Sequence, residues 1–257
     1  FKKIGKFSKA NKTAYNNLSL AFPNLSDGKK QQILENMWGN LGRVAGEFPH
    51  ISKLDSEKFN QYVEHVNYEQ ISKMFKEKQQ VILISAHFGN WELLMRSAYE
   101  LDFPIYSVYR SANNYFIDKY IQNNRAQYQI GSIAKGKNGA KYMIKKIKEK
   151  QSIGMLVDQK MNDGISVPFF NRPAMTAPAV ANLALKYNIP IIPIRVLRLQ
   201  GFNFQIEAFD PIKYDKTGNQ SEDAYNIMLQ INNLLEKWIT EYPEQWFWVH
   251  NRWPKSN

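Results

Sequence analysis

The chain has 257 residues, of which 44% are hydrophobic and 14% aromatic, enough apolar surface for one large core in one domain or at most two. It contains no cysteine, which excludes disulfides, zinc–thiolate sites and cysteine nucleophiles. The net charge of +11 favours an anionic partner, such as nucleic acid, acidic phospholipid or an acidic protein, or else a lysine-rich surface that only aids solubility. No run of 18 apolar residues occurs, so no segment is expected to span a bilayer.

Residues 1–80 are expected to form a helical N-terminal extension. Ser26 is a suitable N-cap for a helix running to about Phe48. Its apolar residues recur every three or four positions, at Ile33, Met37, Leu41, Ala45 and Phe48. This face packs on the core or, alternatively, lies on a membrane or a partner protein.

Residues 81–257 are expected to form a catalytic α/β core, in which strands and helices alternate. The predicted strands are VILISA (81–86), PIYSVY (104–109), SIGMLV (152–157), IPIIPIRVL (189–197) and FNFQIEAF (202–209). The predicted helices are NWELLMRSAYEL, YFIDKYIQNNRAQY, NGAKYMIKKIKEK, PAVANLALKYN and EDAYNIMLQINNLLEKWITEY. The pattern indicates a single α/β domain with a mostly parallel central sheet flanked by helices.

Several common binding and catalytic motifs are incomplete or absent. GSIAKGKN (131–138) approaches a phosphate-binding loop, but Asn138 replaces the hydroxyl residue that such loops need. No G-x-S-x-G elbow is present, which argues against a hydrolase triad. With four scattered histidines and no H-E-x-x-H, no metal site is expected.

The stretch VILISAHFGNWELL (81–94) is the best candidate for a site. An apolar central strand ends at His87, and open α/β sheets bind ligands at the carboxyl ends of their strands. Gly89 permits a tight turn, and Asn90 is a suitable N-cap for a helix beginning at Trp91. With that turn, Glu92 can reach one imidazole nitrogen and leave the other free as a base. The alternative is a histidine that caps the helix beside a solvated glutamate.

At this point the sequence resembles a known family. H-F-G-N-W-E fits the H-x-x-x-x-[DE] signature of glycerolipid-type acyltransferases, and the chain looks like the late acyltransferases of lipid A biosynthesis, the lauroyl and myristoyl transferases. The similar blocks are NLSLAFPNLS (17–26), Tyr109 and Arg110 with Asn114, Asp118 and Arg125, then Asp158 and Gln159, VPFFNRPAMT (167–176) and PEQWFWVHNRW (243–253). Ser111, Asn171 and Lys160 depart from the family's usual residues.

The resemblance implies a fold like that of glycerol-3-phosphate acyltransferase, and transfer of a fatty acyl group from acyl carrier protein to a hydroxyl of a lipid A precursor. His87 would be the general base and Glu92 would orient its ring. The developing oxyanion would meet backbone N–H groups near Gly89 or the Arg110 side chain. No cofactor is expected. The residues expected to bind substrate are Arg110, Asn114, Asp118, Arg125, Asp158, Gln159 and Arg172.

Two other functions compete with this one. The first is the same chemistry on another acceptor, a different glycolipid or a lysophospholipid. The second is a basic nucleic-acid-binding protein, which is disfavoured because the aromatic residues follow strand and helix periods and form no recognisable module.

The expected partners are acyl carrier protein, the lipid A precursor and an anionic membrane surface, with no nucleic acid. We expect the protein at the cytoplasmic face of the inner membrane, held there by charge in a salt-sensitive way. The chain starts with Phe1, and the family's N-terminal membrane helix is expected to be missing from this sequence.

The aromatic C-terminal block permits two interpretations. Trp246, Trp248 and Trp253 either lie at a membrane interface or pack the last helix against the sheet, and we expect packing. Gln245 and His250 are expected in the same buried network.

Overall fold

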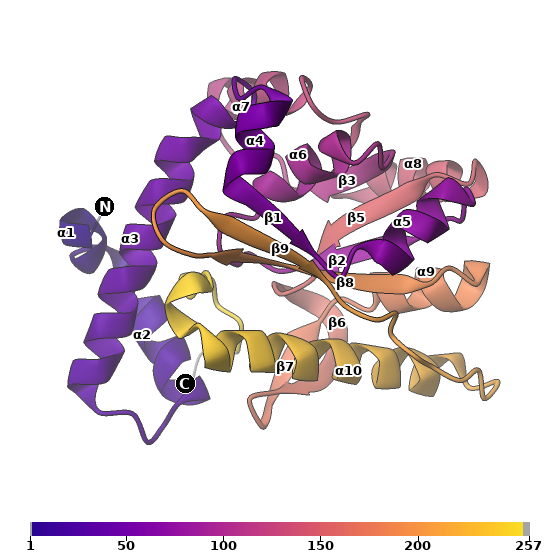
Figure 1. The fold of residues 1–257 in the computed structure, drawn as a ribbon. Helices are drawn as coiled ribbons and strands as arrows, with labels where there is room; N and C mark the ends of the chain where they lie inside the picture. Colours follow the sequence, from indigo (N-terminus) through magenta and orange to yellow (C-terminus); the bar gives the residue numbers. More distant parts are fainter. Residues whose placement is uncertain (1, 254–257) are drawn as a thin grey trace.

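The protein, described here by a computed structural model over residues 2–253, is built on one seven-stranded sheet (Figure 1). The strand order is β1-β9-β8-β2-β5-β3-β4. The strands span Val63–Val66 (β1), Ile82–Ser85 (β2), Ile105–Tyr109 (β3), Ser132–Ala134 (β4), Ser152–Leu156 (β5), Ile191–Arg198 (β8) and Phe204–Ala208 (β9). All neighbouring pairs are parallel except β8 with β9. The expected mostly parallel sheet is therefore confirmed.

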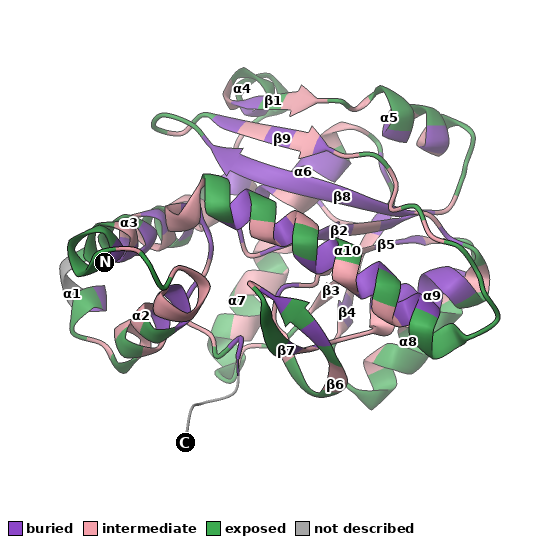
Figure 2. Ribbon diagram, turned by 90° about the horizontal axis from the view of Figure 1, so that it is seen from below, coloured by how far each residue is buried: buried purple, intermediate pink, exposed green. Residues whose placement is uncertain are grey.

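The two central strands are apolar because both of their faces are covered. β2 lies between β5 and β8, and all eight residues of β8 are buried (Figure 2). Ile82 and Ile84 contribute to one hydrophobic cluster, and Val81 and Leu83 to another. This alternation follows from the two-residue period of a strand, which sends successive side chains to opposite faces.

Helices cover both faces of the sheet. α10 crosses below it and α6 lies above it in Figure 1. The helices before the core are Lys2–Lys6 (α1), Lys9–Ala21 (α2), Asp27–Ile51 (α3), Ser56–Tyr62 (α4) and Glu69–Lys76 (α5). The later helices are Leu93–Glu100 (α6), Tyr115–Arg125 (α7), Lys137–Lys148 (α8), Ala179–Tyr187 (α9) and Gln220–Glu241 (α10), followed by the short helix Pro243–Gln245 (η1).

The helix predicted after Ser26 is α3. The Ser26 hydroxyl accepts a hydrogen bond from the backbone N–H of Lys29, as an N-cap does. Leu34, Met37 and Val44 on α3 are buried, so this helix packs on the core. β1, however, lies within the residues expected to be helical and joins the sheet at its edge beside β9.

An antiparallel hairpin, β6 (Lys160–Phe169) and β7 (Arg172–Thr176), was not predicted. Its turn places Phe170 and Asn171 at φ of 50° and 56°. Asparagine tolerates this left-handed conformation better than most residues, which explains how Asn171 can stand in the turn.

No helix in residues 2–253 is both long and apolar enough to cross a membrane.

Candidate active site

The turn after β2 brings His87 to the carboxyl end of the sheet. Gly89 has φ of 58°, and a Cβ there would overlap the carbonyl oxygen of Val196, so only glycine fits. The N–H of Phe88 donates to the Ala86 carbonyl and that of Gly89 to the Gln245 carbonyl. Both N–H groups are therefore occupied, and the expectation that backbone donors near Gly89 face an oxyanion is not met at these two positions.

The His87 ring is held by Asp158, which follows β5. The distance from His87 Nδ1 to Asp158 Oδ1 is 2.8 Å. The other carboxylate oxygen accepts hydrogen bonds from the His87 backbone N–H (3.1 Å) and from Trp246 Nε1 (2.9 Å). Because Nδ1 has this partner, Nε2 is the nitrogen left to act as a base.

Asp158 is fully buried, which by itself disfavours its charged form. The attraction of the His87 ring when it is protonated, together with the hydrogen bonds from His87 and Trp246, outweighs burial and holds the pKa of the Asp158 carboxyl well below its usual value. The carboxylate is therefore ionised at neutral pH, as an imidazole partner should be.

Glu92 does not contact the His87 ring, so the ring-orienting position predicted for it is wrong. Its carboxylate forms a two-pronged pair with Arg125, from Nη2 to Oε1 at 2.7 Å and from Nε to Oε2 at 3.0 Å. The physical reason is the turn at Gly89, which makes Glu92 the N-cap of α6 and directs its side chain to α7. Asn90, the predicted N-cap, lies two residues earlier and accepts a hydrogen bond from the Glu92 N–H.

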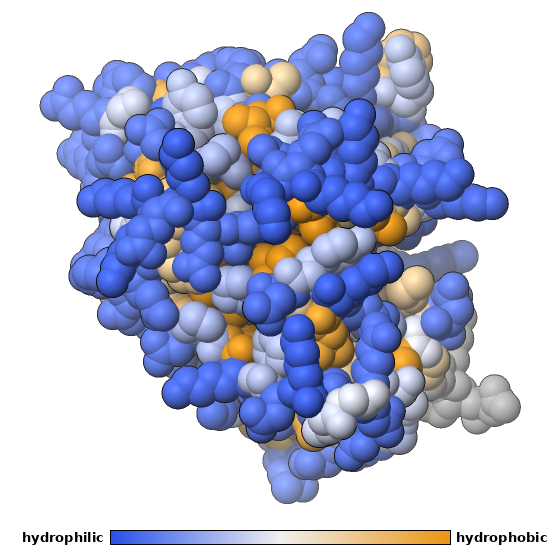
Figure 3. All heavy atoms as spheres, turned by 90° about the vertical axis from the view of Figure 1, so that its right-hand side faces the viewer, coloured by the Kyte–Doolittle hydropathy of each residue, from blue (hydrophilic) through white to orange (hydrophobic). Residues whose placement is uncertain are grey.

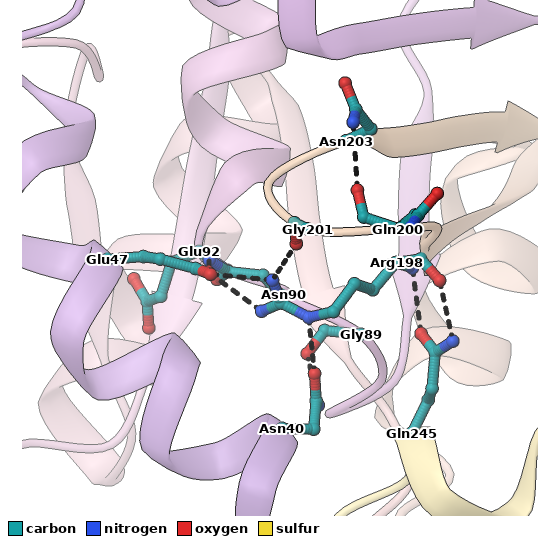
Figure 4. Close-up of polar contacts among 10 residues, drawn as sticks. All are labelled: Asn40, Glu47, Gly89, Asn90, Glu92, Arg198, Gln200, Gly201, Asn203 and Gln245. Carbon is teal, nitrogen blue, oxygen red and sulfur yellow. Dashed lines mark hydrogen bonds and ion pairs between the residues drawn. The ribbon is translucent and has the colours of Figure 1, made fainter.

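A second network fixes the outside of the turn (Figure 4). Asn90 donates to Glu47 of α3, and the same carboxylate pairs with Arg198 of β8 at 2.6 and 2.8 Å. Asn40 of α3 accepts from Arg198 Nε and donates to the Gly89 carbonyl. The turn is therefore held by α3 and β8 together.

His87 lies at the mouth of a cavity of about 340 Å³. Polar side chains at the mouth come from His87, Glu92, Arg110, Arg125, Lys135 and Gln159. Apolar side chains further in include Leu83, Met95, Ala98, Phe103, Ile105 and Met155. The arrangement combines a base beside exposed cationic side chains, Arg110 and Lys135, with an apolar interior.

The comparison with known families now decides the identity. The family model described as bacterial lipid A biosynthesis acyltransferase matches residues 2–255. The chain belongs to this family.

Similar curated proteins carry matching names. A lipid A biosynthesis lauroyltransferase of Escherichia coli K12 is 24% identical over 247 residues, covering 94% of this chain and 78% of that protein. A lipid A biosynthesis acyltransferase of Haemophilus influenzae is 20% identical over 249 residues, covering 96% and 76%. A lipid A biosynthesis myristoyltransferase of Escherichia coli K12 is 23% identical over 257 residues, covering 96% and 75%.

Four of the seven residues expected to bind substrate lie near His87. Arg110, Arg125 and Gln159 line the cavity, and Asp158 lies behind the histidine ring. Gln159 Nε2 is 3.4 Å from His87 Nε2, on the side of the ring that faces the cavity.

The other three expected residues do not line this cavity. Asn114 caps α7, and the Asp118 carboxylate accepts a hydrogen bond from the Ala112 N–H at 2.7 Å. Arg172 donates to the Leu20 carbonyl, which fastens the β6–β7 hairpin to α2. These contacts account for the three side chains without a ligand.

Lys135 was missed as a site residue. It follows edge strand β4 in the stretch that failed as a phosphate loop, its side chain lines the cavity, and partial desolvation there lowers the pKa of its amine. Because parallel strands end at one edge of the sheet, its position directly after a strand was the signal that could have found it.

The aromatic C-terminal block packs inside the protein, as expected. Trp246, Trp248 and Trp253 are all buried, and Trp246 reaches Asp158. Gln245 exchanges two hydrogen bonds with the backbone of Arg198, and burial lowers the pKa of the His250 imidazole. The membrane interpretation of these tryptophans is therefore wrong.

Proposed function

We propose that this chain transfers a fatty acyl group from acyl carrier protein to a hydroxyl of a lipid A precursor, with His87 as the general base. The observation that carries the proposal is the pairing of His87 with the buried Asp158 at the opening of an apolar cavity. A base at that position serves a polar reaction centre, and the interior suits a chain of methylene groups.

In this mechanism His87 Nε2 takes the proton of the acceptor hydroxyl while that oxygen attacks the thioester carbonyl. The tetrahedral intermediate then releases the thiolate of the carrier, which receives the proton from His87, so that atoms and charges balance. Asp158 stabilises the imidazolium that forms between the two steps.

The negative charge on the carbonyl oxygen needs donors. With the N–H groups of Phe88 and Gly89 occupied, the Gln159 amide and the Arg110 guanidinium are the donors that we assign to it. Arg110 and Lys135 together also give the mouth two positive groups for a phosphate of the acceptor.

The cavity can receive a fatty acyl chain. Its volume of about 340 Å³ lies within the usual range of small-molecule sites, and its lining is largely apolar. The sequence resemblance implies a lauroyl or myristoyl donor. No cofactor has a step in this mechanism.

The test is a transfer assay read by mass spectrometry, with acyl carrier protein thioesters of increasing chain length and the tetraacylated, Kdo-bearing lipid A precursor. We expect His87→Ala and Asp158→Asn each to lower kcat by about 10²–10⁴. In the second variant, the amide that replaces the carboxylate can donate to His87 Nδ1 and favour the wrong tautomer. His50→Ala, which removes an exposed histidine of α3, is the matched control.

Full activity in a folded His87→Ala protein would refute the mechanism. Other acceptors, a lysophospholipid and an unrelated glycolipid, belong in the same assay. Faster transfer to one of them would identify that compound as the acceptor in place of the lipid A precursor, and the proposed acyl-transfer chemistry would be unchanged.

A further inference from the structure

α7 is the least buried of the helices around the site. None of its 11 residues is buried, and it is drawn only in pink and green in Figure 2. Its attachments are few: the Arg125–Glu92 pair, a hydrogen bond from Ser132 to Gln122, and a ring contact between Tyr120 and Phe48 of α3. One long side of the helix thus lies open to solvent.

That open side is strongly apolar. Tyr115, Phe116, Ile117 and Tyr120 are 68%, 78%, 54% and 48% exposed. They are four of the eleven large hydrophobic side chains exposed among the described residues. Single exposed apolar residues are normal on protein surfaces, whereas a contiguous group of them marks an interaction surface.

Cationic side chains accompany this surface. Residues 110–135 contain four lysines and arginines, Arg110, Lys119, Arg125 and Lys135, against one acidic residue, Asp118. Lys119 on α7 and Arg110 just before it are exposed, whereas the single acidic residue of the helix, Asp118, is occupied by the Ala112 N–H. Aromatic and aliphatic side chains beside cations match the chemistry of an anionic bilayer surface.

The opposite side of the molecule has a different texture. Seen from the side of α5, α8 and α9, hydrophobic atoms occur in small groups between hydrophilic side chains (Figure 3). α7 and α8 lie well apart in both Figure 1 and Figure 2. α8 carries a similar pair of residues, Tyr142 and Ile144, that are 41% and 37% exposed.

The location of α7 connects this surface to the cavity. Arg110, at the end of β3, and Arg125, the last residue of α7, both line the mouth. A bilayer against α7 therefore lies beside the opening through which an acyl acceptor must reach His87.

We propose that α7 inserts its exposed side chains, Tyr115, Phe116, Ile117 and Tyr120, into the surface of an anionic phospholipid bilayer, and so sets the cavity mouth at the membrane. The inference rests on the proposed function in one respect, that the acceptor is a lipid. Tyrosine prefers the interfacial region of a bilayer, and phenylalanine and isoleucine contribute apolar burial.

The experiment compares two double variants that remove the same residue types at the same spacing. Tyr115→Ser with Ile117→Ser alters α7, and Tyr142→Ser with Ile144→Ser alters α8 as the matched control. Binding is measured by co-sedimentation with vesicles of phosphatidylglycerol and phosphatidylcholine across a salt series. We expect the α7 pair to bind at least about tenfold more weakly than wild type and to lose binding that resists salt, and the α8 pair to stay within about twofold.

Equal loss in both pairs, or no loss in the α7 pair, overturns the proposal. It is also overturned if the α7 pair keeps its affinity for vesicles and loses affinity for acyl carrier protein, since α7 would then dock a protein. Thermal unfolding by circular dichroism verifies that the variants fold.

A parallel transfer assay with acceptor dispersed in detergent separates this proposal from the proposed function. If the α7 double variant transfers acyl groups in detergent at the wild-type rate and binds vesicles weakly, both proposals are supported. If neither the wild type nor either double variant transfers acyl groups, and the α7 double variant still binds vesicles weakly, the proposed function is refuted and the proposal that α7 binds a bilayer is retained.

Discussion

At the scale of single residues, the histidine that follows β2 has a carboxylate partner from a different strand. Asp158 lies 71 positions after His87 and meets it only because β5 pairs with β2. The sequence indicated that both residues follow apolar strands, but no local pattern states which strands are neighbours. Glu92 was the nearer carboxylate in the chain, and the turn at Gly89 sent it to Arg125 instead.

Glu92 and Arg125 should therefore act as a pair in stability. Their side chains are only 12% and 17% exposed, so removing one partner leaves a largely buried charge unpaired. We expect Glu92→Gln and Arg125→Gln each to lower the free energy of unfolding by about 1–3 kcal/mol, and the double variant to lose less than the sum. Urea unfolding measures all three.

The control for this cycle is Glu149→Gln, which removes a surface partner of Lys145 and Lys146. Such an exposed ion pair contributes little to stability, so a small change is expected. Strict additivity of the Glu92 and Arg125 substitutions would contradict their coupling.

At the scale of elements, apolar runs predicted the core strands and missed the polar ones. The five predicted strands became β2, β3, β5, β8 and β9, with ends that differ from the prediction by at most two residues. β4 has only three residues, β1 (VEHV) has two polar residues among its four, and β6 contains the polar stretch MNDG. Helices such as α3 and α10 were predicted because a capping residue and an apolar face can both be recognised within a short stretch of sequence.

Strand β5 also sets the size of the cavity. A Cβ at Gly154 would lie 3.2 Å from Ile105 Cγ2 and 3.9 Å from Met95 Sδ, inside the cavity wall. We expect the series Gly154→Ala, Val and Leu to shorten the preferred acyl chain step by step, because each added group takes the place of a methylene of the substrate. For Gly154→Leu, transfer of a 12-carbon chain should fall at least about tenfold relative to an 8-carbon chain.

The ratio of kcat/KM for the two chain lengths is the measured quantity, since a loss of folded protein lowers both equally. An unchanged ratio across the series would show that the acyl chain lies elsewhere.

At the scale of the whole molecule, two partly buried histidines make stability depend on pH. Burial lowers the pKa of His65 and of His250, so the folded protein holds both rings neutral where the unfolded chain protonates them. Below an unfolded pKa of about 6.5 the unfolded state binds more protons, and stability falls as the pH falls. Asp158 adds nothing in this window, because its lowered pKa matters only below about pH 4.

We expect the free energy of unfolding to decrease between pH 7.5 and pH 5.5, by up to about 1.4 kcal/mol per pH unit for each histidine. His250→Asn should flatten this slope, because the amide can still donate to the Phe247 carbonyl that faces His250 Nδ1 and does not titrate. Urea unfolding at several pH values measures the slope. An identical slope in His250→Asn would show that other groups cause it.

The hydrogen bond from Trp246 to Asp158 has a consequence for biosynthesis. Asn17 of α2 likewise donates to the carbonyls of Trp248 and His250, more than 230 positions later in the chain. The ribosome synthesises these two segments at the start and at the end of translation, so the Asp158 carboxylate lacks one of its donors until residue 246 has emerged. The nascent protein is therefore expected to remain inactive through nearly all of its translation, and activity should begin only once the C-terminal block has folded back onto the sheet.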